Sequence, residues 1–218
     1  MGGDNPNILA KVISQKHQCI FVHIPKCGGS SIEDVVWPGV RTEQDLWMGF
    51  VDEFRNRHQT GGLQHLCAHQ IRDEVGEEQY LQFWKFAFVR NPFDRAVSQF
   101  VYMNRRPDLR RFLGMSEGAS FGEYLQLITE TQHVQWKPQS SFILDPETGE
   151  IMVDFVARFE RYSTDARAIF DRLGIRVGVV PHANQGLRGN YRDYYSEADR
   201  KMVQALCGDD LEIFQYLF

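Results

Sequence analysis

The stretch "HIPKCGGSS", residues 23–31, directly follows the apolar run "CIFV" at residues 19–22. The apolar run predicts a buried strand, and glycines followed by serines are typical of a turn into a helix. Glycines let backbone amides approach a ligand, and a helix N-terminus favours negative charge. Lys26 adds a mobile positive charge. The stretch therefore predicts an anion site, whereas a plain turn would explain the glycines and Ser30 but not Lys26.

The order of residues in this loop differs from that of a nucleoside-triphosphate P-loop. A P-loop carries its lysine after the glycines, as Gly-Lys-Ser/Thr, whereas Lys26 precedes Gly28 and Gly29. The sequence also offers no convincing acidic partner for magnesium. A nucleotide kinase is therefore disfavoured, but it stays an alternative.

A second strand-to-helix junction has a similar character, in "FVRNPFDRAVSQF" at residues 88–100. Arg90 ends an apolar strand, and Ser98 follows about two helical turns later, which would bring its hydroxyl near the same anion. Arg95 is expected to pair with Asp94 or with a neighbouring helix. An ordinary surface salt bridge is the alternative for Arg90. Anion sites after two adjacent strands suit a ligand with phosphate-type groups at both ends.

Strand and helix patterns alternate along the rest of the chain, which predicts an α/β fold. We expect a single domain with a mainly parallel central sheet flanked by helices, and ligands at the carboxyl ends of the strands. The expected division is an N-terminal extension, 1–18, and one domain, 19–218. The predicted strands are 19–24, 84–90, 151–155 and 175–180; the predicted helices begin at Ser30, Asn91, Ser120, Ser163, Ser196 and Asp210.

Composition excludes several classes of protein. The 218 residues carry a formal charge of −5, which argues against general nucleic-acid binding. Four cysteines without paired spacing indicate free thiols in a reducing compartment. No apolar run is long enough to span a membrane, so we expect a cytoplasmic protein, with the Golgi lumen as the alternative if an anchor is missing from this sequence. Two basic clusters are either solvated faces or sites for an anionic ligand: Arg55, Arg57 and His58; Arg105, Arg106, Arg110 and Arg111.

The two binding motifs together resemble those of sulfotransferases that use 3′-phosphoadenosine 5′-phosphosulfate (PAPS). The likeness is to the carbohydrate branch with the chondroitin 4-O and heparan 2-O enzymes, sulfotransferase family 2, whose fold is P-loop-NTPase-like. It extends through "AHQI", "HVQWKPQSSFI", "VARFERY" and "NYRDYYS", at residues 68–71, 133–143, 156–162 and 190–196, and so covers nearly the whole chain after residue 19.

The resemblance implies a role for each matching residue. Lys26 would contact the bridging and sulfuryl oxygens, and the loop from Cys27 to Ser31, with Gly28, Gly29 and Ser30, would surround the 5′-phosphate. Arg90 and Ser98 would hold the 3′-phosphate. Cys27 stands where threonine is common in the family, so a hydroxyl contact is either missing there or replaced by packing.

In the implied reaction, a hydroxyl of a glycan or small metabolite attacks sulfur in line and 3′-phosphoadenosine 5′-phosphate (PAP) leaves. Lys26 and the helix-end amides neutralise charge, so no metal is required. The base is expected to be a histidine. His69 matches the catalytic position of heparan 2-O-like relatives and ranks first, His133 second and His65 third, while His23 lies inside the strand and is expected to be a core residue. Glu33 is expected to cap the helix that begins at Ser30.

The sequence also raises alternatives to this interpretation. A non-catalytic PAPS- or PAP-binding module would keep both phosphate sites, and transfer to an amine would use the same donor site. His65 and His69 have helical spacing that mimics a metal site, but no third ligand follows. Late aromatic residues either close over adenine or seal the core, and Phe159 and Tyr162 raise the same question: Arg188, Tyr191, Tyr194 and Tyr195.

Overall fold

The computed structural model describes residues 13–38, 65–180 and 189–218. They belong to two compact units. The first, the sheet unit, contains the described residues up to Val89 and those from Ser141 to 180; the second, the helical unit, contains Arg90–Ser140 and the described residues after 188. Four residues singled out in the sequence lie outside the described residues: Arg55, Arg57, His58 and Arg188.

The sheet unit is built on four strands in the order β1-β2-β3-β4. β2 pairs in parallel with β3, and β3 in parallel with β4, whereas β1 pairs antiparallel with β2. This mostly parallel sheet with flanking helices confirms the predicted α/β class. The division at residue 18 stays a prediction. The strands are β1 (Ile13–Ser14), β2 (Cys19–Val22), β3 (Trp84–Val89) and β4 (Phe155–Arg158).

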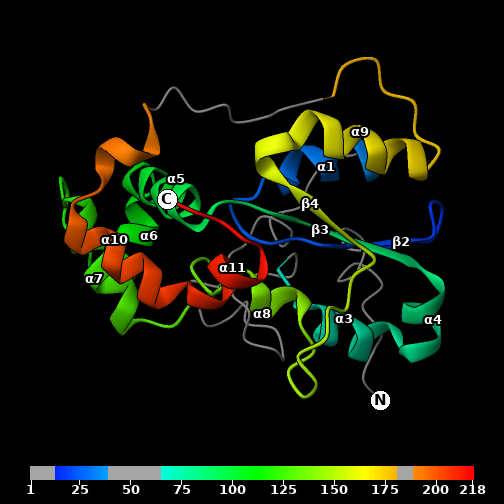
Figure 1. Ribbon diagram of the computed structural model, residues 1–218. Helices are drawn as coiled ribbons and strands as arrows, with labels where there is room; N and C mark the ends of the chain where they lie inside the picture. Colours follow the sequence, from blue (N-terminus) through cyan, green and yellow to red (C-terminus); the bar gives the residue numbers. More distant parts are fainter. Residues whose placement is uncertain (1–12, 39–64, 181–188) are drawn as a thin grey trace. The chain divides into compact units, whose positions relative to one another are not determined.

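Helices lie on both sides of this sheet. In Figure 1, α1 and α9 lie on one side of the strands, and α3 and α4 lie on the other. Two-sided cover explains why β2 is wholly buried and β3 nearly so, since a strand buried on both faces reads as a continuous apolar run. The helices are α1 (Gly29–Val36), α3 (Ala68–Val75), α4 (Glu77–Gln82) and α9 (Tyr162–Arg172), preceded by the 3-10 turn η2 (Phe159–Arg161).

The helical unit packs around α5 (Pro92–Asn104), with Asn91 as its N-cap and Pro92 in its first turn, as predicted. The α7 helix (Phe121–Glu130) and α10 (Glu197–Leu206) begin with the predicted serine caps. The helices α5, α7 and α10 pack against one another. The other elements are α6 (Pro107–Leu113), η3 (Tyr191–Tyr194) and α11 (Gly208–Ile213); α8 (Ser140–Ile143) lies where the chain passes from this unit to the other.

Two predicted strands are wrong. Instead of 151–155, β4 covers Phe155–Arg158, because Ile151 is half exposed and forms an isolated bridge with Leu144 rather than a ladder. Residues 175–180 form no strand, and Val179 is 85% exposed. Branched residues favour a strand only where a neighbouring strand supplies packing and hydrogen bonds. Among the described residues, no helix is long and apolar enough to cross a membrane.

Candidate functional site

The lysine loop, residues 23–31, links β2 to α1 inside the sheet unit. Gly28 takes the left-handed conformation, with φ +87°, at the N-cap position of α1, and Lys26 is also left-handed, with φ +66°. Such backbone is rare for a residue with a side chain, so surrounding contacts must hold Lys26 in it. Lys26 is half-buried, while Cys27 is buried and its thiol donates to the Pro25 carbonyl at 3.6 Å.

Both glycines of this loop lie against other side chains. A Cβ on Gly29 would lie 2.3–2.4 Å from the His23 ring, and one on Gly28 would lie 3.0 Å from the Tyr162 ring and 3.1 Å from that of Phe159. The first distance is below any normal contact, and Gly28 would also suffer strain from its φ angle. Packing inside the chain therefore requires glycine at both positions, independently of any ligand.

Tyr162 supports the loop from α9. Its hydroxyl donates to the Gly28 carbonyl at 3.3 Å. Burial raises the pKa of Tyr162 to about 12 despite a hydrogen bond with Ser31 that lowers it, so the phenol is neutral at physiological pH. Ser31 is 1% exposed, whereas Ser30 is half-buried. The sequence left the roles of Tyr162 and Phe159 undecided. In the structure both rings pack against Gly28 and support the loop.

The predicted cap of α1 is wrong. The helix begins at Gly29 with Gly28 as N-cap, no side chain caps it, and its first turn holds no acidic residue. Glu33 turns inward instead, to 2.6 Å from His23 Nδ1, and is 1% exposed. The N-terminus of α1 carries the positive end of the helix dipole, which favours an anion.

His23 and His65 are structural residues. His23 is 4% exposed and pairs with Glu33, as expected for a core histidine. His65 Nδ1 donates to the His23 carbonyl at 2.8 Å, and the two rings meet edge to face. His65 is 3% exposed, which removes it from contact with an acceptor.

His69 lies in the first turn of α3 in the same unit and is half-buried. The helix starts at Ala68, so His65 precedes it and the predicted helical pair does not exist. In the described part of the chain, no three His, Cys, Asp or Glu side chains are grouped as a metal site. His69 is therefore the more accessible of the two histidines in this segment.

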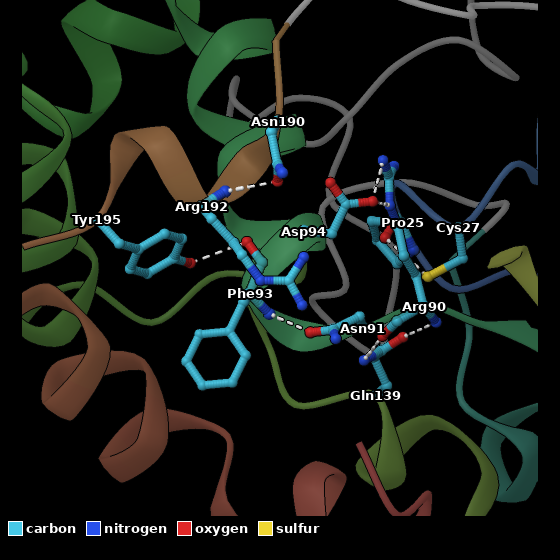
Figure 2. A network of polar contacts seen from close by, with 10 residues as sticks. All are labelled: Pro25, Cys27, Arg90, Asn91, Phe93, Asp94, Gln139, Asn190, Arg192 and Tyr195. Carbon is cyan, nitrogen blue, oxygen red and sulfur yellow. Dashed lines mark hydrogen bonds and ion pairs between the residues drawn. The ribbon is translucent and has the colours of Figure 1, made fainter. Parts of the chain in front are cut away.

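Arg90 belongs to the helical unit and follows directly after the last residue of β3. Figure 2 shows its guanidinium facing Asp94, whose Oδ2 accepts from Nε and from Nη2, each at 2.7 Å. Asp94 and Ser98 are four residues apart on α5 and therefore share one face of the helix. Ser98 is half-buried, and its proximity to the Arg90 guanidinium stays a prediction.

Contacts in the helical unit bear on the predictions for Arg95 and for the basic cluster near α6. Arg95, which is 4% exposed, donates to the carbonyls of Lys137 and Gln135. Two arginines of the basic cluster at 105–111 have partners on or near α6. Arg106 pairs with Asp108, and Arg110 donates to the Asn104 carbonyl. Arg105 and Arg111 are exposed. Part of this cluster therefore serves α6 itself.

His133, in the helical unit, is enclosed by aromatic rings. Its ring lies 5.0 Å from that of Trp136 and 5.4 Å from that of Phe112, and its Nδ1 accepts the Gln135 N–H. Burial lowers the pKa of His133 to about 4. A base with so low a pKa is weak at neutral pH, which counts against His133 in proton removal from a hydroxyl.

The late tyrosines of the helical unit pack inward. Tyr195 donates to the Phe93 carbonyl at 2.8 Å, and its ring meets those of Phe93, Phe121 and Phe218 edge to face. Tyr194 meets Phe121 and Tyr191 meets Phe218 in the same way. These contacts agree with the sealing role that the sequence left open.

Comparison with known protein families agrees with the resemblance that the two motifs indicate. The sequence model of the sulfotransferase family matches residues 11–217. The chain belongs to the sulfotransferase family. An uncharacterised protein of Archaeoglobus fulgidus is 25% identical over 126 residues, which make up 57% of this chain and 96% of that protein. A solved sulfotransferase from Alicyclobacillus acidocaldarius is 20% identical and aligns with 97% of this chain and 94% of its own, with a TM-score of 0.36.

Membership of the sulfotransferase family supports a transferase that moves a sulfuryl group. The family generally uses PAPS as donor and a hydroxyl-bearing acceptor. The lysine loop lies in the sheet unit, and the Arg90 segment lies in the helical unit.

Proposed function

We propose that the chain is a PAPS-dependent O-sulfotransferase that releases PAP. The observation that carries the proposal is the start of α1: an uncapped helix N-terminus with no acidic residue in its first turn, directly after Lys26. Such a terminus favours a phosphate, because the positive end of the helix dipole attracts negative charge. The family match supports sulfuryl transfer as the reaction at this terminus.

We assign the residues that bind PAPS to the two charged ends of that molecule. Lys26 serves the bridging and sulfuryl oxygens, and Gly28, Gly29 and Ser30 serve the 5′-phosphate. Cys27 and Ser31 back the loop, since both are buried and their side chains contact Pro25 and Tyr162. Arg90 and Ser98 serve the 3′-phosphate, for which the guanidinium offers several donors.

In the proposed reaction, the acceptor oxygen attacks sulfur opposite the 5′-phosphate oxygen. The new O–S bond forms as the bond from sulfur to the phosphate oxygen breaks, and the acceptor proton passes to a base. His69 is the proposed base, because it is half-buried, whereas His65 is buried and His133 has a pKa of about 4. Lys26 stabilises charge that develops on the leaving oxygen, so the reaction requires no metal.

The proposed acceptor is a hydroxyl of a glycan or of a small metabolite. The exposed Arg105 and Arg111 favour an anionic acceptor. A screen of sulfated and unsulfated glycans beside phenols and simple alcohols, with labelled PAPS, identifies the class by the product that carries the label.

The deciding test is calorimetric titration of the purified protein with PAP, beside ATP plus magnesium. We expect tight PAP binding that does not need metal, little response to ATP, and PAP affinity about 10- to 100-fold weaker in Arg90→Ala. ATP binding without PAP binding would contradict the proposal and favour a kinase. PAP binding with no transfer to any acceptor, and no effect of His69→Ala on any turnover, would instead favour a non-catalytic binding module.

A further inference from the structure

A buried side-chain amide holds the backbone of Arg90. Gln139 Oε1 accepts the Arg90 N–H at 2.8 Å, and Gln139 Nε2 donates to the Arg90 carbonyl at 2.8 Å. Figure 2 shows this pair of hydrogen bonds beside the guanidinium contact to Asp94. Gln139 is fully buried, and Arg90 is 6% exposed. The amide thus bonds both backbone groups of one residue, as an opposing strand does in an antiparallel ladder.

Asp210 fixes the orientation of that amide. Its Oδ2 accepts from Gln139 N at 2.8 Å and from Gln139 Nε2 at 3.3 Å, and its Oδ1 accepts from Ser140 N at 2.7 Å. Because Asp210 Oδ2 accepts from the NH₂ side of the amide, Oε1 is turned toward the Arg90 N–H. Asp210 is fully buried, and these three bonds offset its desolvation.

The guanidinium is held from the other end. Asp94 Oδ2 accepts from both Nε and Nη2 of Arg90, in an ion pair across one turn of α5. Backbone and side-chain tip of Arg90 are therefore each fixed by buried or half-buried partners. A pre-positioned arginine loses less conformational entropy when it binds an anion.

We propose that Gln139 and Asp210 are positioning residues for Arg90 in donor binding. This inference rests on the proposed function, in which Arg90 contacts the 3′-phosphate. Neither residue contacts the donor: Asp210 sets the amide of Gln139, and the amide sets the backbone from which the guanidinium extends. The sequence gives little sign of the arrangement, because Asp210 lies 71 residues from Gln139.

The variant that isolates this role is Asp210→Asn, with Asp209→Asn as its matched control. Asp209 is the neighbouring carboxylate on the same helix and is exposed. An asparagine at 210 presents its own NH₂ group and removes the reason for the amide of Gln139 to keep its orientation. Gln139→Met is the second variant, to be used if Asp210→Asn fails to fold, since methionine keeps similar bulk without either hydrogen bond.

The readout is the affinity for PAP relative to that for AMP, which lacks the 3′-phosphate. We expect about a tenfold weaker PAP affinity in Asp210→Asn, an unchanged AMP affinity, and a raised KM for PAPS with kcat nearly unchanged at saturating PAPS. Asp209→Asn should behave as the native protein. In an Arg90→Ala background, Asp210→Asn should cause no further loss of PAP affinity.

Each outcome decides between the two proposals. If Arg90→Ala weakens PAP binding but Asp210→Asn and Gln139→Met do not, or if their losses add to that of Arg90→Ala, the positioning role is wrong and the 3′-phosphate assignment stands. Equal losses for PAP and AMP would also overturn the positioning role, because they indicate general damage to the unit. If Arg90→Ala leaves PAP affinity unchanged, both the assignment and the positioning role are wrong.

Discussion

The lysine loop and the Arg90 segment both follow a parallel strand and begin a helix, yet they are held by different forces. Around Gly28 and Gly29 the constraint is steric, since rings of His23, Phe159 and Tyr162 fill the space that a side chain would need. Behind Arg90 the constraint is a buried hydrogen-bond network through Gln139 and Asp210. The comparison shows that packing shapes the backbone of the lysine loop, whereas polar partners fix the backbone and side chain of Arg90.

The largest expected effect comes from Lys26→Ala, which removes positive charge from the lysine loop. We expect kcat to fall about 100- to 1,000-fold, because a charge aimed at the transition state is lost, with the fold unchanged. The measurement is sulfuryl transfer with labelled PAPS beside circular dichroism. Lys16→Ala, at an exposed lysine of the same unit, is the control. Native activity in Lys26→Ala would show that Lys26 takes no part in sulfuryl transfer.

Gly29→Ala tests the steric half of the comparison. The new Cβ would lie 2.3 Å from the His23 ring, so we expect the free energy of unfolding to fall by about 3 kcal/mol, from overpacking. Urea denaturation followed by fluorescence gives the value. Gly178→Ala, where the added Cβ meets nothing within 4 Å, should be nearly neutral. Equal stability of the two variants would show that the rings yield, and that Gly29 is not required by packing.

The fold could be predicted as far as local signals reached. Continuous apolar runs identified β2 and β3, and the serine caps identified α7 and α10 to within a residue. The strand at 175–180 was wrong because branched residues do not reveal whether a neighbouring strand is present. Ser30 was assigned as a cap because Glu33 has capping-box spacing, but His23, ten residues earlier, takes the carboxylate instead.

The candidate site was predictable where its residues lie within one short stretch of sequence. Lys26, Gly28 and Gly29 lie in one loop, and the i,i+4 spacing of Asp94 and Ser98 follows from α5. Gln139 and Asp210 lie 49 and 71 residues from their partners, so no periodicity connects them. Side-chain networks that close only in three dimensions leave no spacing to read, which is why the support of Arg90 was missed.

His133 provides a pH-dependent test of the helical unit. Its pKa falls from an ordinary 6.5 to about 4 on burial, so between these values the unfolded chain binds more protons than the folded one. Stability contributed by the neutral ring is complete above pH 6.5 and is lost as the pH falls toward 4, by about 2 kcal/mol after allowance for solvent screening of a half-buried ring. Urea denaturation at several pH values measures this slope.

His133→Asn is the matched variant, because asparagine also accepts an N–H two residues on and does not titrate. The difference in stability between the native protein and this variant should shrink by that amount from pH 7 to pH 4. A constant difference would mean that His133 is not buried in its neutral form. Transfer activity should be retained; its loss in a well-folded His133→Asn would transfer the role of base from His69 to His133.

The smallest effect is expected at Ser120, where a purely local signal decides the start of α7. The Ser120 hydroxyl accepts the Glu123 N–H, and Glu123 Oε2 accepts the Ser120 N–H in return at 2.7 Å. The Ser120 hydroxyl also donates to Glu123 Oε2 at 2.7 Å, and this bond, followed by that from the Ser120 N–H, lowers the pKa of Glu123. Ser120→Ala should cost about 1 kcal/mol of stability, measured by urea denaturation, because the Glu123 N–H loses its acceptor and Glu123 Oε2 loses the hydroxyl donor. Ser116→Ala, at an exposed serine just before this helix, is the control. This cap is distant from Arg90 in the sequence and is not part of its hydrogen-bond network. Ser120→Ala should therefore leave PAP affinity unchanged, whereas Asp210→Asn should weaken it. A similar loss of PAP affinity in both variants would mean that general loosening of the helical unit, and not the Gln139 amide, controls donor binding.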